Sequence, residues 1–96
     1  MDLLVTYDVN TLTKEGRNRL RKVAKVCVGF GQRVQYSVFE ITVNAVQRER
    51  LMEKLMATID KTEDSLRIYH LYGGREKVVE SYGRDSYVDF GGTLLV

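Results

Sequence analysis

The chain has 96 residues, a mass of 11.1 kDa and a formal net charge of +2, with 44% hydrophobic and 29% charged residues. This composition excludes a disordered chain, and the length predicts a single domain with a small core. No apolar run approaches the roughly 20 residues that span a bilayer, so we expect a cytoplasmic protein with no membrane partner. One cysteine and one histidine exclude an intrachain disulfide and a zinc site built from Cys and His.

The first third of the chain predicts a strand followed by a helix. Residues 3–7 form an apolar strand, and Asp8 follows it directly. The helix is expected at residues 13–28, with Thr11 or Thr13 as its N-cap. The apolar residues that recur at three- and four-residue intervals predict its buried stripe: Leu20, Val23, Ala24 and Cys27.

The rest of the chain predicts two short antiparallel strands within residues 30–43, a helix at 45–59 and a fourth strand at 66–72. This order predicts an α+β domain at residues 1–75, with the ferredoxin-like βαββαβ arrangement and an antiparallel sheet. Residues 76–96 are expected to be a tail that ends in an additional strand. Because an apolar terminal strand needs a partner, we expect it to pair across a homodimer. The second helix has an apolar side expected to contain Val46, Leu51, Leu55 and Ile59.

Asp8 is the strongest candidate for chemistry, because a carboxylate at a strand end is held by a rigid scaffold. Mg²⁺ prefers oxygen ligands and is often held by one or two carboxylates together with water and substrate phosphate. One carboxylate binds Mg²⁺ weakly, so we expect two copies of Asp8 to share one ion across a twofold axis. The alternative is that Asp8 only forms a turn or caps the following helix.

The exposed side of the first helix is strongly basic. Between Thr13 and Cys27 six basic residues accompany a single acid, Glu15. A local cationic field of this kind is typical of a surface that contacts the phosphates of a nucleic acid. The residues that share one face, and that we expect to bind nucleic acid, are Lys14, Arg17, Arg21 and Lys25.

Three segments carry a resemblance to a known family. They are residues 4–9 (LVTYDV), the Arg17-Asn18-Arg19 triplet and residues 32–40 (QRVQYSVFE). In this order and spacing they resemble the small CRISPR-associated endoribonuclease family Cas2, and the resemblance covers residues 1–75.

The resemblance implies a ferredoxin-like homodimer that takes part in spacer acquisition and bridges two dimers of the integrase Cas1. It also implies a metal-dependent endonuclease that acts on single-stranded RNA or on double-stranded DNA. By position, Asp8 matches the metal-binding aspartate of the family. The other residues that the resemblance ties to activity are Tyr7, Arg17, Arg19, Arg33, Ser37 and Phe39.

Each of these residues also has a structural interpretation. Arg17 is as well suited to an ion pair with Glu15 or Glu40 as to a phosphate, and Arg19 is open to a similar pairing. Phe39 is better explained by the core or an interface than by base stacking. If the strand is regular, alternation places a further set on one sheet face: Arg33, Gln35, Ser37 and Phe39.

Two functions therefore stay open. In the first, the protein is a nuclease in which Asp8 holds Mg²⁺ and a phosphodiester is hydrolysed. In the second, it is an architectural subunit whose basic helices hold duplex DNA while a partner integrase performs the chemistry.

Overall fold

A computed structural model describes residues 1–71 and 77–84 of the chain. Seven elements lie within these residues. In chain order they are β1 (Asp2–Asp8), α1 (Lys14–Val28), β2 (Gly31–Gln35), β3 (Val38–Thr42), α2 (Ala45–Thr58), β4 (Ser65–Leu71) and β5 (Lys77–Gly83).

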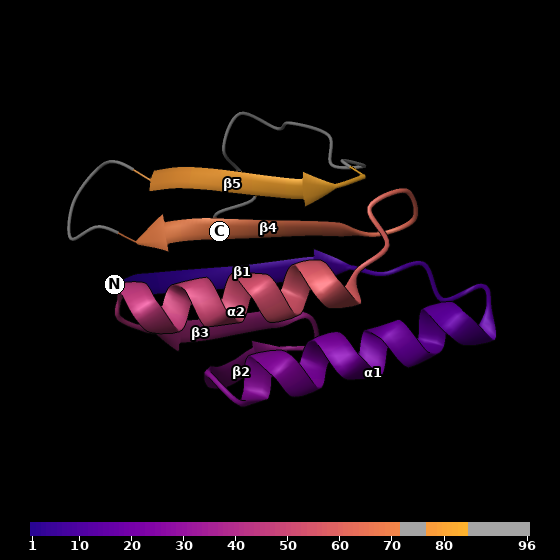
Figure 1. Cartoon of the computed structure of the whole chain (residues 1–96), viewed down its shortest axis with the longest axis horizontal. Helices are drawn as coiled ribbons and strands as arrows, with labels where there is room; N and C mark the ends of the chain where they lie inside the picture. The colour runs from indigo at the N-terminus through magenta and orange to yellow at the C-terminus, as the bar shows by residue number, and fades with distance from the viewer. Residues whose placement is uncertain (72–76, 85–96) are drawn as a thin grey trace.

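The strands form one antiparallel sheet in the order β2-β3-β1-β4-β5 (Figure 1). The first four strands and two helices are the predicted ferredoxin-like βαββαβ unit, which is confirmed. β1 lies at its centre and pairs with β3 on one side and β4 on the other. The pairing with β3 stops at Thr6, whereas the pairing with β4 continues to the end of β1, where Asp8 lies opposite Ser65.

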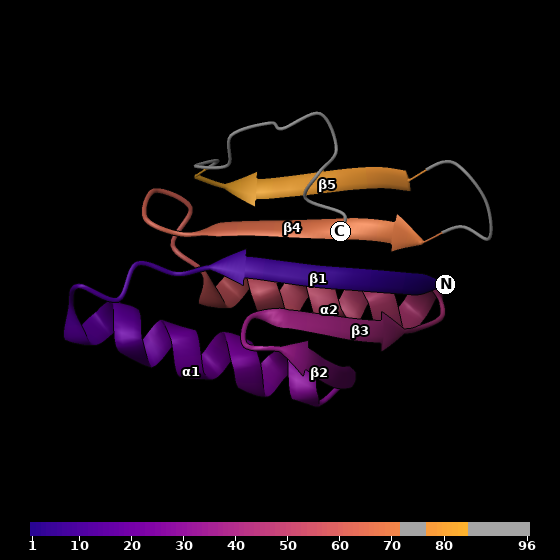
Figure 2. The same cartoon turned by 180° about the vertical axis from the view of Figure 1, so that it is seen from behind.

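Both helices cover the same face of the sheet, and the view from behind shows the opposite face without a helix (Figure 2). Alternation along β1 decides which side chains enter the core. Leu3, Val5 and Tyr7 are buried on the helix-covered side, whereas Asp8 is exposed. Because neighbouring residues of a strand point to opposite faces, Tyr7 and Asp8 lie on opposite sides of the sheet.

α1 follows its predicted pattern. Thr13 is the N-cap, and its hydroxyl accepts a hydrogen bond from the Gly16 N–H at 3.0 Å. Val23 and Cys27 are fully buried, and Leu20 and Ala24 pack against the same core. Burial raises the pKa of the Cys27 thiol to about 12, so Cys27 is a core residue rather than a nucleophile.

α2 begins at a capping box, in which Asn44 and Gln47 exchange hydrogen bonds between side chain and main chain. Leu51, Leu55 and Ile59 are buried as predicted. The prediction was wrong for Val46, which is 58% exposed. Its place in the first turn carries it past the edge of the core that the other three residues fill.

β5 adds a fifth strand within the segment that the sequence predicted only as a tail. It pairs along its whole length with β4 of the same chain. Glu80 anchors it to α2, because both carboxylate oxygens accept hydrogen bonds from the Arg48 guanidinium at 2.6 Å. The terminal strand predicted at residues 91–96, and its pairing across a dimer, lie outside the described residues.

Because Glu80 is anchored in this way, we expect part of the free energy of unfolding to depend on pH in the acid range. Burial alone would raise the pKa of Glu80, but hydrogen bonds from Arg48, Tyr82 and His70 outweigh it and lower the pKa to about 2. Because the pKa is depressed on folding, the stabilisation is complete above the ordinary value of 4.5 and is lost as the pH falls towards 2. We expect Glu80→Gln to remove about 1–3 kcal/mol of stability above pH 4.5 and to flatten the pH dependence below it.

Urea unfolding followed by circular dichroism between pH 2 and 7 measures this effect. Glu53→Gln is the control, because Glu53 is exposed on the same helix that supplies Arg48. If the free energy of unfolding of the Glu80 variant fell between pH 4.5 and 2 as steeply as that of the unchanged protein, the contact with Arg48 would not stabilise β5.

Neither described helix combines the length and the apolar character that crossing a membrane requires.

Candidate functional site

Asp8 is the last residue of β1, and its side chain is exposed on the helix-free side of the sheet. The register pairs Asp8 with Ser65 at the start of β4, and Ser65 in turn with Gly83 at the end of β5. Directly paired residues in an antiparallel sheet project to the same face, so the Asp8 carboxylate and the Ser65 hydroxyl are neighbours. The last residues of β1 and β5 and the first residue of β4 therefore lie together at this edge of the sheet.

A pocket of about 220 Å³ lies at this edge, which we call the Asp8 pocket; it is lined by Asp8, Asn10, Glu63, Ser65 and Arg84. Asn10 connects two parts of its wall. The Asn10 side-chain amide donates to Glu63 Oε2 at 3.2 Å, and its oxygen accepts from the Leu12 N–H at 3.0 Å. Glu63 thus brings a second carboxylate to the pocket from a loop more than 50 positions away in the sequence.

The loop between β1 and α1 is packed tightly against the helix. A Cβ at Gly16 would lie 1.8 Å from the main-chain oxygen of Asn10, so only glycine permits this approach. The Asn10 N–H donates to Asp64 Oδ1 at 3.1 Å. These two contacts fix the segment that follows Asp8.

Asp64 is fully buried beside the pocket and connects the segments that surround it. Its carboxylate accepts four hydrogen bonds: from Arg19 Nε at 2.8 Å, from Arg19 NH2 at 3.2 Å, and from the N–H groups of Asn10 and Asp60 at 3.1 and 2.9 Å. A buried charge needs this degree of pairing to offset its desolvation. Asp64 therefore joins α1, the loop after Asp8 and the loop before β4.

Sequence reasoning missed Asp64 but had a signal for it. Arg19 lies four residues before Val23 and three after Gly16, which places it on the buried side of α1. A charged residue in that stripe needs a buried partner. The structural interpretation of Arg19 has the support of this ion pair, and a catalytic role for Arg19 stays a prediction.

Tyr7, Arg33 and Phe39 form a second group on the helix-covered side of the sheet. The rings of Tyr7 and Phe39 stack with centroids 6.1 Å apart, and the Arg33 guanidinium lies 5.2 Å from the Phe39 centroid. Burial raises the pKa of the Tyr7 phenol, and a hydrogen bond with Arg33 partly offsets this rise. Phe39 is fully buried, as its structural interpretation predicted.

The regular alternation considered for residues 33–39 does not occur. β2 ends at Gln35, residues 36–37 form a turn, and the register shifts between Arg33 and Gln35. Ser37 thus lies in the turn, where its carbonyl accepts from the Tyr7 N–H at 3.2 Å. A pocket of about 290 Å³ brings Ser37 and Arg33 together with other residues of this side: Tyr7, Leu20, Arg21, Ala24 and Tyr36.

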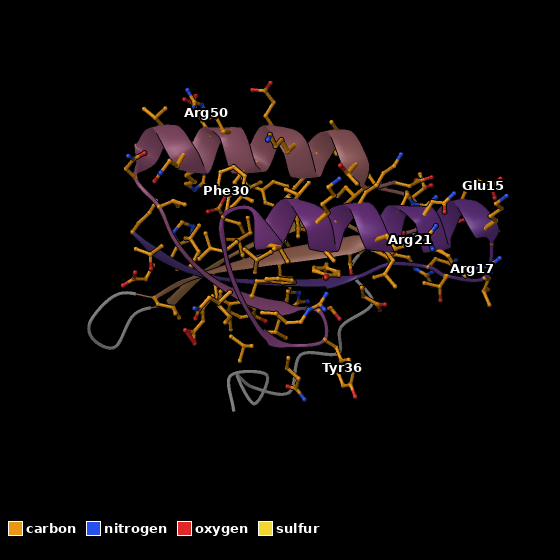
Figure 3. The ribbon with its side chains drawn as sticks, turned by 90° about the horizontal axis from the view of Figure 1, so that it is seen from below. Glu15, Arg17, Arg21, Phe30, Tyr36 and Arg50 are labelled. Carbon is orange, nitrogen blue, oxygen red and sulfur yellow. The ribbon has the colours of Figure 1, made fainter. Side chains whose placement is uncertain are left out.

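The basic face of α1 is exposed along its length, at Lys14, Arg17, Arg21 and Lys25. Arg17 donates to the Thr11 carbonyl at 3.2 Å, rather than pairing with Glu15 or Glu40, and Arg21 donates to the Asn18 side chain. Figure 3 shows Arg17 and Arg21 on the side of α1 towards the turn that contains Tyr36. The guanidinium groups remain accessible to an anion in solution.

The predicted residues are thus divided among three places. Asp8 lies in its pocket on the helix-free side, Tyr7, Arg33, Ser37 and Phe39 lie on the other side, and the basic face runs along α1. Within the described part of one chain, they do not converge on one site. Their roles in activity stay predictions.

A comparison with family models matches residues 1–77 to the family described as CRISPR associated protein Cas2. The chain belongs to the Cas2 family. The match covers the complete ferredoxin-like unit, including Asp8 and the strand that carries Phe39.

Relatives in this family match over the full length. The chain is 50% identical to CRISPR-associated endoribonuclease Cas2 1 of Moorella thermoacetica and 48% identical to CRISPR-associated endoribonuclease Cas2 of Chlorobaculum tepidum, each over 96 residues and 100% of both chains. It is 45% identical to CRISPR-associated endonuclease Cas2 of Halalkalibacterium halodurans, over 99% of both chains.

A solved structure, Streptococcus pyogenes Cas2 at pH 6.5, is similar in fold. It superposes with a TM-score of 0.71 at 53% identity, covering 75% of this chain and 87% of the other. Membership of the Cas2 family, predicted from residues 4–9, 17–19 and 32–40, is confirmed by the family model and by the relatives.

Proposed function

We propose that this Cas2-family chain is a magnesium-dependent endonuclease that cleaves phosphodiester bonds in single-stranded RNA and in double-stranded DNA. The observation that carries the proposal is the Asp8 pocket, where an exposed carboxylate lies at the rigid end of β1 beside Glu63 and Ser65. The names of the full-length relatives support the same class of activity.

The donors in the Asp8 pocket suit Mg²⁺. Asp8 and Glu63 provide two carboxylates, and the buried Ser65 hydroxyl has no hydrogen-bond partner among the described residues. No group of three or more His, Cys, Asp or Glu occurs in residues 1–71 and 77–84, and an ion that keeps several waters does not need one. The volume of about 220 Å³ has room for several waters at roughly 30 Å³ each.

When bound, Mg²⁺ would polarise a phosphate oxygen and lower the pKa of a bound water. The contribution of the chain is to hold Asp8 still. The pairing of Asp8 with Ser65 of β4 and the tight loop at Asn10 fix the main chain around the carboxylate before any ligand arrives. Such preorganisation lowers the cost of ordering the site when substrate binds.

We also propose a homodimer in which two Asp8 side chains face each other across a twofold axis. Two features support it: Asp8 lies on the helix-free side of the sheet, and neither of the two described helices covers that side (Figure 2). Because Glu63 already provides a second carboxylate within one chain, the metal does not depend on the dimer. If the protein is a monomer in solution, two Asp8 side chains cannot share one ion, and only the pair of carboxylates within one chain, Asp8 and Glu63, is left to bind Mg²⁺.

The experiment is a cleavage assay on a single-stranded RNA and on duplex DNA, with Mg²⁺ and with EDTA. We expect scission that requires Mg²⁺ and disappears with the chelator. A cut that persists in EDTA would come from a contaminating nuclease, and the absence of any cut with Mg²⁺ would refute the nuclease proposal.

The second candidate function is that of an architectural subunit that binds duplex DNA and bridges Cas1 dimers during spacer integration. The exposed basic face of α1 favours it, because its four cations lie along one side of a regular helix. Phosphate contacts of this kind need no sequence-specific groups and no metal.

The basic face makes a prediction that applies to both functions. We expect the triple variant Arg17→Gln, Arg21→Gln, Lys25→Gln to weaken binding of duplex DNA and to reduce the slope of log K against log salt by about 2–3, since each lost phosphate contact contributes roughly 0.9. Fluorescence anisotropy at several salt concentrations measures the slope. The double variant Arg50→Gln, Lys61→Gln is the control, because both side chains are exposed outside α1. An equal loss of slope per charge in the control would exclude the α1 face as the binding surface.

A further inference from the structure

Arg84 is the arginine that lines the Asp8 pocket. The arginines that the sequence tied to activity have other positions: Arg17 contacts Thr11, Arg19 pairs with Asp64, and Arg33 lies over Phe39. Within residues 1–71 and 77–84, Arg84 forms no ion pair, and its side chain is exposed at the pocket. The pocket thus combines two carboxylates with one uncommitted guanidinium.

The main chain at Arg84 is held in place. Its N–H donates to the Asp64 carbonyl at 2.6 Å. Gly83 has φ of +87°, and a Cβ there would lie 2.3 Å from the same carbonyl oxygen, so glycine is required for both its conformation and the close approach. Asp64 therefore stabilises the pocket through two groups: its carboxylate accepts a hydrogen bond from the Asn10 N–H, and its main-chain carbonyl accepts one from the Arg84 N–H.

Ser65 gives an independent indication of a ligand. The residue lines the pocket and is 5% exposed, and its hydroxyl has no hydrogen-bond partner within residues 1–71 and 77–84. A buried hydroxyl without a partner is uncommon and costs free energy unless something satisfies it. A bound water or phosphate oxygen in the pocket would provide that partner.

We propose that Arg84, presented by the end of β5, binds a phosphate of the nucleic-acid substrate in the Asp8 pocket, with the Ser65 hydroxyl as a further hydrogen-bond donor. This inference rests on the proposed cleavage of nucleic acid and adds a residue to it. A guanidinium in the same pocket as two carboxylates suits a phosphodiester, because the arginine would attract the anion while a bound hydrated Mg²⁺ would neutralise the carboxylates. The strand beyond the ferredoxin-like unit then has a functional reason to end where it does.

The test compares Arg84→Gln, Arg84→Lys and Arg50→Gln with the unchanged protein on a single-stranded RNA oligonucleotide. Arg50 is the matched control, because it is an exposed arginine on α2 (Figure 3) and is not among the residues that line the pocket. Cleavage is measured with Mg²⁺, and binding is measured in EDTA over a range of salt concentrations. Thermal unfolding of each variant is recorded to show that the fold is retained.

For Arg84→Gln we expect a loss in kcat/KM of about 10- to 100-fold and a reduction in the salt slope of about 0.7, the share of one phosphate on a single strand. Arg84→Lys should retain the slope and recover part of the rate, and Arg50→Gln should change neither. If Asp8→Asn abolishes cleavage while Arg84→Gln behaves like Arg50→Gln in both measurements, the inference on Arg84 is overturned and the nuclease proposal stands. If the unchanged protein does not cut, the nuclease proposal fails, and the salt slope alone decides whether Arg84 contacts phosphate.

Discussion

Replacing Asp8 with asparagine is expected to lower magnesium-dependent cleavage by at least about 100-fold, the effect of removing one well-placed group that stabilises charge at a reacting centre. The amide has nearly the same shape as the carboxylate but lacks the negative charge that attracts Mg²⁺. Because Asp8 is exposed and lies at the end of β1, the change should leave stability within about 0.5 kcal/mol. A rate assay with saturating Mg²⁺, together with urea unfolding, separates the two effects.

Asp2→Asn is the control for this measurement. Asp2 begins the same strand, projects to the same side and accepts a hydrogen bond from the Thr42 hydroxyl at 2.8 Å, but it lies at the opposite end of the sheet. Its replacement should leave cleavage unchanged. Full magnesium-dependent activity in the Asp8 variant would exclude Asp8 as the metal ligand. If the Asp8 variant supports spacer integration by a Cas1 partner as well as the unchanged protein does, the architectural function is favoured.

Replacing Asp64 with asparagine is expected to cost about 3–5 kcal/mol of the free energy of unfolding, the range for breaking a buried ion pair by removing one partner. Each Asp64 oxygen accepts two hydrogen bonds, so an amide nitrogen in either position would face two donors. Domains of this size have a total stability of about 5–15 kcal/mol, so the variant should be close to unfolding. Urea unfolding at neutral pH measures the loss.

Glu63→Gln is the control for Asp64. Glu63 is the neighbouring acid, is exposed and accepts one hydrogen bond from the Asn10 side chain. Its replacement should change stability by no more than about 0.5 kcal/mol. A similar small change for Asp64→Asn would mean that the ion pair with Arg19 does not organise the pocket.

Local patterns were enough to predict most of the secondary structure. Thr11 or Thr13 was expected as the N-cap of the first helix and Thr13 is found there, because a cap depends only on the residues that follow it within one turn. The strand 3–7 and the helix 13–28 were predicted from hydrophobic period, which needs no distant contact. β5 was not predicted as an element, because its polar residue Glu80 is held by Arg48 from another part of the chain and by the Tyr82 hydroxyl.

The candidate site was predicted less completely. The place of Asp8 at a strand end followed from the sequence, but Glu63, Ser65 and Arg84 did not. These three residues reach Asp8 only through the pairing of β1 with β4 and of β4 with β5. The resemblance tied the adjacent residues Tyr7 and Asp8 to activity, and the alternation of β1 places their side chains on opposite faces.

Amphipathic periods and capping residues act over a few positions, so the amino-acid order was sufficient for the ferredoxin-like unit, the basic face of α1 and membership of the Cas2 family. The residues that surround Asp8 depend on strand register, which is set by the packing of the whole sheet. A shift of one residue in β4 would have turned Ser65 away from the pocket and left Asp8 without that neighbour. The composition of the pocket therefore followed only from the folded arrangement of β1, β4 and β5.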